Sequence, residues 1–363
     1  MFEIIIFSFV IIILVKFSSL TRKDGFRNLI IKRKLNTPSI FEGEKISVSI
    51  IVENRKRLPI LFMLIEEQMP IEIIGRSYTN RTLYSIGSYE RVKKTYVTQI
   101  PQRGVYLFKK MDVILGDIFG LFSIKKEIED YKEVLVYPRI KKISKLSFDN
   151  TSYQGDSIVK RWVFKDPLYI KGIREYVKED RMKDIHWKSS LKMNKLMVKD
   201  YDYTSEREFI IIMNNQCDEI YWRYVNKKAV DDCIKVTLAT ADAAIKEGIK
   251  VGAWTNANII SYSNMVQSET KCSSSIKEIL ELCTRMDYIP RYSFYEYMNK
   301  MINCFDHNNT YVIVTSYLCE KDVLIINSLR KKGINLKIVD VSEKGAVPYI
   351  RGVEKIEYRG EKH

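Results

Sequence analysis

Residues 172–190, GIREYVKEDRMKDIHWKSS, bring together many side chains that could do chemistry. Five Lys or Arg and four Asp or Glu surround a single Trp and His186, which is one of three histidines in the chain. A histidine among carboxylates could act as a general acid or base, and grouped cations could bind phosphate groups. Catalysis and nucleic-acid binding are therefore the first functions to consider for this stretch.

Nucleic-acid binding would need cations on one face, with exposed aromatic side chains on which bases stack. Here the acids alternate with the cations, which favours local ion pairing. These acids are Glu175, Glu179, Asp180 and Asp184. We therefore expect no nucleic-acid partner, and the net charge of +15 is compatible with an anionic partner such as a phospholipid surface.

Enzyme chemistry has no local motif either. The sequence contains no GxxxxGK[ST] or GxGxxG loop, no GxSxG elbow and no HExxH motif. Its six Cys lie at wide spacings without a CxxC pair, which indicates reduced thiols. We expect no catalytic residues and no cofactor. A hydrolase, the less favoured alternative, would need a pocket around a nucleophile with a shifted pKa.

Local pattern predicts the elements that position the charged stretch. YIKGIREYV, residues 169–177, alternates as a strand does, and Asp180 suits a turn or a helix N-cap. MKDIHWKSSLKM, residues 182–193, predicts a short helical turn that buries Ile185 and Trp187. His186 beside this Trp is then a partly exposed or packed side chain rather than a catalyst.

A β-domain is predicted before this stretch, over residues 39–148. KISVSIIVEN, YERVKKTYVTQI, GVYLFKKMDVIL and KEVLVYPRI have the composition and period-two alternation of strands, with turn residues between them. Several short strands at this spacing are typical of an antiparallel sandwich of immunoglobulin-like size.

An α/β domain is predicted after it, over residues 207–345. Apolar strands alternate there with amphipathic helices, which is typical of a parallel sheet covered on both faces. The strands fall at residues 208–215, 250–257, 310–318 and 334–341, and the helices at 225–247, 273–286, 291–305 and 320–332. A ligand site would lie at the carboxyl ends of the strands.

Residues 1–20, MFEIIIFSFVIIILVKFSSL, predict a transmembrane anchor. The apolar run 2–15 would be about 21 Å long as a helix, and extension to Leu20 brings it toward the ~30 Å of a bilayer core. Cations in residues 21–38 then place the rest of the chain in the cytoplasm. We expect a single-pass protein of the cell membrane. The alternatives are a cleaved signal peptide and a peripheral or core helix.

The charged stretch resembles the signature of the bacterial family called "domain of unknown function 58". The matching residues are Arg174, Glu175, Tyr176, Asp180, Ile185, Trp187, Lys188, Leu196 and Val198, whereas Glu179 stands where the family usually has Gly. The segments RGVYLF, GDIFGLF and VYP resemble the β-domain of the same family. The signature residues of that β-domain here are Arg103, Gly104, Gly116, Asp117, Phe119, Gly120 and Phe122.

This resemblance spans residues 39–341 and implies a membrane-anchored protein that works beside MoxR-type AAA+ ATPases. It implies an immunoglobulin-like β-sandwich followed by a von Willebrand factor A-like, doubly wound α/β domain. Family members commonly carry two transmembrane helices, whereas one span is predicted here.

The resemblance also raises the question of a metal site. In von Willebrand factor A-like domains, the loop after the first parallel strand carries Asp-x-Ser-x-Ser, whose oxygens hold a divalent cation. Asn214, Gln216 and Asp218 stand at that spacing here, and Thr315 stands where a supporting Asp is expected. Because Mg²⁺ prefers carboxylate ligands, we interpret the loop as an ordinary polar loop, with Mg²⁺ binding as the alternative.

We therefore predict an α+β multidomain protein. Its parts are a transmembrane anchor (1–20), a basic juxtamembrane linker (21–38), a β-sandwich (39–148), a signature junction (149–206), an α/β domain (207–345) and a C-terminal tail (346–363). The predicted function is a non-enzymatic scaffold for assembly or maturation of envelope-associated complexes. It would dock a MoxR-type ATPase through the α/β domain and residues 174–188. The alternative is a metal-dependent ligand-binding domain.

Overall fold

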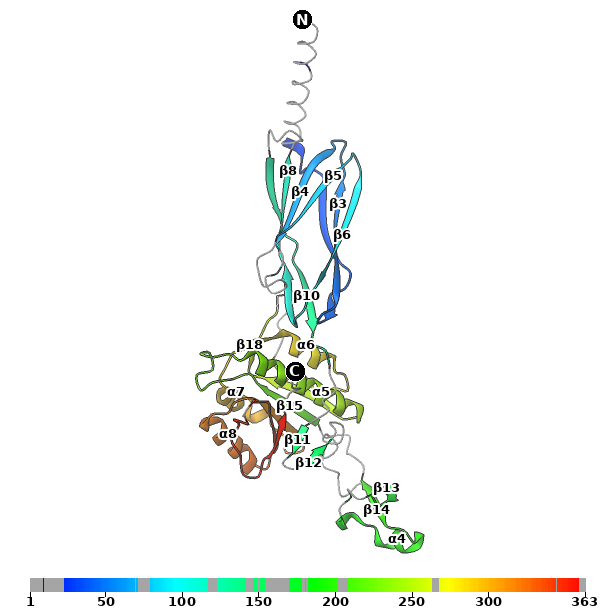
Figure 1. Cartoon of the computed structure of the whole chain (residues 1–363), viewed down its shortest axis with the longest axis vertical. Helices are drawn as coiled ribbons and strands as arrows, with labels where there is room; N and C mark the ends of the chain where they lie inside the picture. The colour runs from blue at the N-terminus through cyan, green and yellow to red at the C-terminus, as the bar shows by residue number, and fades with distance from the viewer. Residues whose placement is uncertain are drawn as a thin grey trace. The chain divides into compact units, whose positions relative to one another are not determined.

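The computed structural model divides the chain into two compact units, Met1–Arg139 with Ser261–Met265, and Ile140–Ile260 with Val266–His363 (Figure 1). No helix among the described residues is long and apolar enough to cross a membrane. The anchor predicted at residues 1–20 lies outside the described residues apart from Phe9, so it stays a prediction. The described residues are 9, 23–68, 70, 79–116, 123–140, 146–148, 151–153, 170–177, 180, 182–201, 208–262, 268–343 and 345–358.

The first unit is a β-sandwich with two layers. One layer is the sheet β1-β3-β6, and the other contains the sheets β5-β4-β8-β9 and β2-β10-β7. All strand pairs in it are antiparallel except β2 with β10. The strands are β1 Leu29–Leu35, β2 Ser39–Phe41, β3 Lys45–Asn54, β4 Ile60–Gln68, β5 Thr79–Ile86, β6 Arg91–Gln99, β7 Gly104–Phe108, β8 Met111–Gly116, β9 Ser123–Ile128 and β10 Lys132–Tyr137.

Alternation of apolar residues holds the two layers together. On β3, the side chains of Ile46, Val48, Ile50 and Val52 are all buried, as the period of two predicts. Those of Ile50 and Val52 pack against β4, β5 and β8, and those of Ile46 and Val48 pack against β2, β7 and β10. Full burial of each such side chain is worth about 1.5–3 kcal/mol.

β1 lies within the range predicted as a basic linker. It pairs with β3 from Leu29 opposite Asn54 to Leu35 opposite Val48. The sequence does not predict this strand, because a cation stands at one of its inward positions, where strands usually have an apolar residue. That cation is Arg33, one of three in the strand, and it is buried. Its charge is balanced inside the sandwich, where Arg33 Nε lies 2.8 Å from Glu67 Oε1.

The chain enters and leaves the sandwich at opposite ends (Figure 1). β1 starts with Leu29 beside Asn54, the last residue of β3. β10 ends with Tyr137 beside Phe41, which shortly precedes the first residue of β3. The length of β3 therefore separates the two points.

The second unit contains a seven-stranded sheet of order β12-β11-β21-β20-β19-β15-β16. It is parallel from β16 to β21. The strands of this unit's sheet are β11 Leu146–Phe148, β12 Thr151–Tyr153, β15 Glu208–Asn214, β16 Lys250–Thr255, β19 Thr310–Thr315, β20 Asn335–Asp340 and β21 Glu354–Tyr358. The other elements are α5 Lys227–Lys246, β17 Ala257–Ile259, α6 Lys277–Arg285, β18 Met286–Pro290, α7 Phe294–Lys300, η2 Ile302–Cys304 and α8 Glu320–Lys331.

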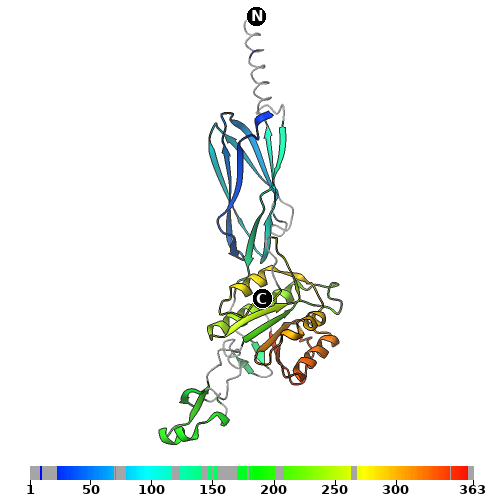
Figure 2. The same cartoon turned by 180° about the vertical axis from the view of Figure 1, so that it is seen from behind.

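Helices cover both faces of this sheet, as the sequence predicted. α5 and α6 lie on one face and α7 and α8 on the other (Figures 1 and 2). Ile210 and Ile212 pack in a cluster with residues of α7 and α8, whereas Met213 Sδ lies 3.9 Å from Cys283 Sγ on α6. Successive residues of β15 are thus buried on opposite faces, which explains its unbroken apolar sequence.

β21 falls in the range predicted as a C-terminal tail. It pairs in parallel with β20, and Ile356 is its one fully buried side chain. One apolar residue among charged ones gave no strand signal. Residues 354–358 therefore belong to the α/β domain.

Residues 170–201 form a separate two-stranded element, which we call the signature hairpin. β13 pairs with β14 in antiparallel register, with Arg174 opposite Val198 and Glu175 opposite Met197. The predicted strand at 169–177 is thereby confirmed over β13. The elements are β13 Ile170–Glu175, η1 Met182–Asp184, α4 Trp187–Met193 and β14 Met197–Tyr201.

Candidate interaction site

The parallel strands determine where a ligand site could lie. Numbered along the chain, β15, β16, β19, β20 and β21 are adjacent in the order 2-1-3-4-5. The connections leave β15 in opposite directions, so the switch point lies at the carboxyl ends of β15 and β19. The predicted metal loop follows β15 and therefore occupies this point.

Buried amides close the switch point. Asn214 Nδ2 donates to Thr315 Oγ1 and to Tyr317 O, both at 3.0 Å. Asn214 Oδ1 accepts from Gln216 N at 2.9 Å and from Asn256 Nδ2 at 3.0 Å. Both polar atoms of the Asn214 side chain are thus used within the protein, and the residue is buried.

The rest of the loop is also bound internally. Gln216 Oε1 accepts from Phe294 N at 2.8 Å, at the start of α7, and its Nε2 donates to Asp218 O at 2.8 Å. Asp218 Oδ2 accepts from Arg223 Nε at 2.8 Å. The hydrogen bond from Arg223 lowers the pKa of the Asp218 carboxyl. Asp218 therefore faces a guanidinium group rather than the amides.

This geometry fits a metal ion poorly. The structure brings Asn214, Gln216 and Thr315 together at the predicted place, but as mutual hydrogen-bond partners. The one carboxylate, Asp218, is paired with Arg223. Across the described residues, no group of three His, Cys, Asp or Glu could hold a metal ion. The arrangement instead fixes the loop and the start of α7.

The cysteines with shifted pKa values are not activated nucleophiles. Burial raises the pKa of the Cys233 thiol well above its usual value and that of Cys272 to about 12. Burial also raises the pKa of Cys319. Such thiols stay protonated near neutral pH, where only the thiolate is reactive.

A bidentate ion pair closes the signature hairpin. Arg174 Nη1 lies 2.6 Å from Asp180 Oδ2, and Nη2 lies 2.5 Å from Oδ1. Val177 N also donates to Asp180 Oδ2, at 2.9 Å. Asp180 thus orders the turn that follows β13 instead of capping a helix.

A second acid of the signature is paired as well. Glu175 Oε1 lies 2.9 Å from Lys195 Nζ, in an exposed ion pair. Tyr176 N donates to Leu196 O at 2.9 Å and extends the ladder between the strands. Local pairing of acids with cations, predicted from their alternation, is confirmed for both Glu175 and Asp180.

Ile185 and His186 attach α4 to β14. Ile185 is only 4% exposed and forms an isolated bridge with Val198. His186 N donates to Met197 O at 2.8 Å, and the Nδ1 of its ring accepts from Ser189 N at 3.1 Å. The predicted burial of Ile185 is confirmed, and the imidazole caps a helix.

The predicted burial of Trp187 is wrong. Trp187 is 61% exposed, because Ser190 occupies the inner side of α4, with its Oγ accepting from Met197 N at 2.8 Å. Leu191, one helical turn after Trp187, is 83% exposed. Since residues four apart share one side of a helix, these two form what we call the apolar row of α4.

Two lysines border the apolar row. Lys188 directly follows Trp187, and Lys192 directly follows Leu191. Both lysines are exposed. Their own spacing of four places them on one side of the helix, and we call them the basic row. Further exposed apolar side chains of the signature hairpin are those of Ile173, Val177, Met182, Met193 and Leu196.

The described signature residues of the β-domain have structural roles. Arg103 is buried, and Gly104 adopts a φ of +148°, which favours glycine at the start of β7. Gly116 ends β8, between Phe62 of β4 and Ser123 of β9. The other predicted residues lie outside the described part of the chain, namely Asp117, Phe119, Gly120 and Phe122.

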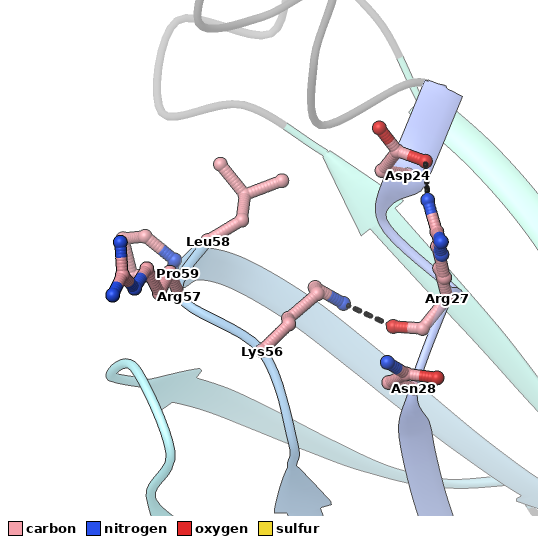
Figure 3. Close-up of a pocket in the computed structure, with 7 residues that line it drawn as sticks. All are labelled: Asp24, Arg27, Asn28, Lys56, Arg57, Leu58 and Pro59. Carbon is pink, nitrogen blue, oxygen red and sulfur yellow. Dashed lines mark hydrogen bonds and ion pairs between the residues drawn. The ribbon is translucent and has the colours of Figure 1, made fainter.

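A hollow of about 500 Å³ lies where the chain enters the sandwich (Figure 3). Lys56 Nζ donates into it, to Arg27 O at 2.9 Å and Gly25 O at 2.5 Å, and Arg27 pairs with Asp24 at 3.8 Å. Two of its cations are therefore engaged with the protein itself. Its lining residues are Asp24, Arg27, Asn28, Lys56, Arg57, Leu58 and Pro59.

Comparison with known proteins finds a family match over part of the chain. Residues 172–350, which contain most of the signature hairpin and the α/β sheet as far as β20, match the family model described as "Protein of unknown function DUF58". This finding confirms the resemblance over that range.

The chain is also similar in sequence to "Uncharacterized protein YeaD" of Bacillus subtilis (strain 168). It is 20% identical over 230 residues, which cover 61% of this chain and 54% of YeaD. The match thus spans about half the length of that relative.

Two solved structures share a weaker likeness with this chain. The CARDB domain of the PF1109 protein from Pyrococcus furiosus, in complex with di-metal ions, is 14% identical, with 30% of this chain and 91% of that domain covered at a TM-score of 0.23. Spo0M, a sporulation control protein from Bacillus subtilis, is 13% identical, with 30% and 49% covered at a TM-score of 0.19. Likeness at such scores carries no information about function.

Proposed function

We propose that this chain is a membrane-tethered, non-enzymatic scaffold that binds a protein partner through the signature hairpin. The observation that carries the proposal is the exposure of Trp187 and Leu191 side by side on α4. Exposed apolar side chains that adjoin one another mark interaction surfaces. Trp is also enriched among the residues that dominate binding energy at protein interfaces.

The hairpin supports this role because α4 is fixed before any partner arrives. The ion pair between Arg174 and Asp180 closes the turn after β13, and the bridge between Ile185 and Val198 fixes the start of α4. A surface already in its bound conformation loses less conformational entropy on binding. Arg174 and Asp180 thus act by positioning α4, while Trp187 and Leu191 make the contact.

The partner that we propose is a MoxR-type AAA+ ATPase, in the assembly or maturation of envelope-associated complexes. This proposal extends the resemblance in the signature region, where residues 172–350 match the DUF58 family model. The tether would be residues 1–20, with the body in the cytoplasm. Arg33 is buried in the sandwich and cannot reach an anionic leaflet, whereas Lys32 and Lys34 of the same strand are exposed.

Two observations favour a scaffold over the alternatives. The amides at the switch point are bound to one another, and burial raises the pKa of Cys233 and Cys272. A metal-dependent ligand-binding domain would need Asp218 free, whereas Arg223 binds it. The docking role uses Trp187 and Leu191 as the structure shows them. The metal alternative requires Asp218 to leave Arg223.

Co-purification tests the proposal. The full chain is isolated from solubilised membranes together with a MoxR-type ATPase of the same organism. Trp187→Ser with Leu191→Ser should reduce the bound ATPase at least tenfold, because the apolar contact is removed while Ile185 and Ser190 keep α4 in place. The matched control is Leu83→Ser with Tyr131→Ser, which removes two exposed apolar side chains of the first unit and should leave binding unchanged.

Two results would contradict the proposal. Full binding by the Trp187 and Leu191 variant would exclude the signature hairpin as the site. A wild-type chain that retains no ATPase under conditions where both proteins are folded would exclude this partner class.

A further inference from the structure

We infer that the partner presents an acidic amphipathic helix to α4, with one row of apolar residues beside one row of Asp or Glu. This inference rests on the proposed docking function and specifies the chemistry of the partner. It follows from the two rows of α4, which combine apolar side chains at 187 and 191 with cations at 188 and 192.

The charge on α4 is not neutralised within the described structure. Lys188 and Lys192 are exposed and have no acidic partner among the described residues, and the same holds for Lys183 on η1. Nearby acids are already occupied, since Asp180 binds Arg174 and Glu175 binds Lys195. Asp184, which is partly buried, is the remaining described acid between residues 180 and 199. The apolar row therefore has a positive border.

The spacing of the rows determines the shape of a complementary surface. Residues four apart on a helix are separated by about 6 Å along its axis. A partner helix with carboxylates four apart would meet Lys188 and Lys192 together, while apolar residues beside them would cover Trp187 and Leu191. A basic partner surface would be rejected, because like charges at an interface are strongly unfavourable.

A protein segment fits α4 better than an anionic bilayer does. Interfacial helices bind lipid in proportion to the apolar area that they insert. α4 has seven residues, and three of them, Trp187, Leu191 and Met193, are exposed and apolar, so the area that the helix could insert is small. Protein interfaces, in contrast, concentrate binding energy in a few side chains such as Trp, surrounded by a polar rim.

Photo-cross-linking identifies the bound segment directly. A benzoylphenylalanine at position 193 replaces an exposed Met at the end of α4 and leaves both rows intact. The full chain is cross-linked in native membranes, and the adducts are sequenced by mass spectrometry. Adducts with segments that carry Asp or Glu four residues apart beside apolar residues are expected. Adducts only with lipid, or with neutral or basic segments, would overturn the inference.

Charge variants supply the second arm. Lys188→Glu with Lys192→Glu should reduce the protein adduct at least tenfold, whereas Lys188→Arg with Lys192→Arg should keep it. The matched control, Lys271→Glu with Lys277→Glu, reverses two exposed cations elsewhere in the second unit and should have no effect. Circular dichroism checks that each variant is folded.

The two proposals fail in different ways. If Trp187→Ser with Leu191→Ser abolishes the adduct while the Glu variant keeps it, the docking site stands and the acidic partner is excluded. If the serine variant keeps the adduct, the docking site itself is excluded.

Discussion

Arg174 and Asp180 face each other across a turn, with each nitrogen of the Arg174 fork donating to a different carboxylate oxygen, at 2.6 and 2.5 Å. Both are among the residues that carry the resemblance to the DUF58 family, and they form an ion pair with one another. These two residues hold the shape of the hairpin, whereas Trp187 and Lys188, which belong to the same set of matching residues, are exposed on α4.

Arg174→Ala should loosen the turn after β13. Loss of a partly exposed bidentate pair costs about 1 kcal/mol, which corresponds to roughly fivefold faster exchange where the turn opens locally. The amide of Val177 reports this opening, because it donates to Asp180. Hydrogen exchange measured by mass spectrometry provides the test. Lys195→Ala removes the exposed pair with Glu175 and should change little, so equal effects of the two variants would contradict a special role for Arg174.

Asn214→Asp should destabilise the second unit by about 2–3 kcal/mol, because the amide hydrogens that now bind Tyr317 O and Thr315 Oγ1 are lost at a buried position. Urea unfolding followed by Trp fluorescence measures the change. Asp218→Asn, at an exposed ion pair, is the mild control. If millimolar Mg²⁺ restored the free energy of unfolding of Asn214→Asp, the switch point would be able to bind a metal ion.

The wild-type loop should not bind Mg²⁺ or Mn²⁺. Asn214 Oδ1 already accepts two hydrogen bonds, and Asp218 is paired with Arg223. Isothermal titration calorimetry of the full chain with either metal should show no binding heat at millimolar concentration. Saturable heat that disappears in Asp218→Asn would show that the carboxylate leaves Arg223 for a cation.

Glu67→Ala should cost about 3–5 kcal/mol of unfolding free energy, because it leaves the Arg33 guanidinium buried without its anion. The two side chains are 0% and 1% exposed. Thermal unfolding followed by far-UV circular dichroism measures the loss. Replacing both residues, as Arg33→Met with Glu67→Leu, should recover most of it. The exposed pair of Arg55 and Glu53 is the control, and its removal should change the free energy of unfolding far less than Glu67→Ala does.

The contribution of Asp322 to the free energy of unfolding should decrease as pH rises above 3.8, the ordinary pKa of an Asp carboxyl. Burial raises the pKa of Asp322 above 3.8, so the native state holds its proton at pH values where the unfolded state has lost it. The contribution is therefore largest below pH 3.8 and is lost as pH rises through the raised pKa. The stability of wild type relative to Asp322→Asn, from urea unfolding, should fall over this interval. A constant difference would mean that the pKa is unshifted.

Periodic segments could be predicted well from the sequence. β3 covers the whole of KISVSIIVEN, and α5 fills most of the predicted helix at 225–247, because one face of each element is continuously apolar. The long apolar strands of the second unit could be located for the same reason. The pairing of acids with cations in the signature also followed from their alternation.

Elements whose pattern is broken by charge could not be predicted. β1 contains three cations, one of which is buried only because Glu67, far away in the sequence, binds it. β21 has a single fully buried apolar residue. Residue type predicts Trp187 in the interior, whereas the hydrogen bond between Ser190 and Met197 sets which side of α4 faces inward. The spacing of Trp187, Lys188, Leu191 and Lys192 was the available sign of the two outer rows.

Entry and exit of the chain at opposite ends of the sandwich have a mechanical consequence. Tension between residue 28 and residue 139 would pull along β1, parallel to its ladder with β3. All seven paired positions from Leu29 to Leu35 would then resist in shear at once, whereas a pull across the strands would open them one by one. Tension along the chain would therefore meet the strongest resistance at the ladder between β1 and β3.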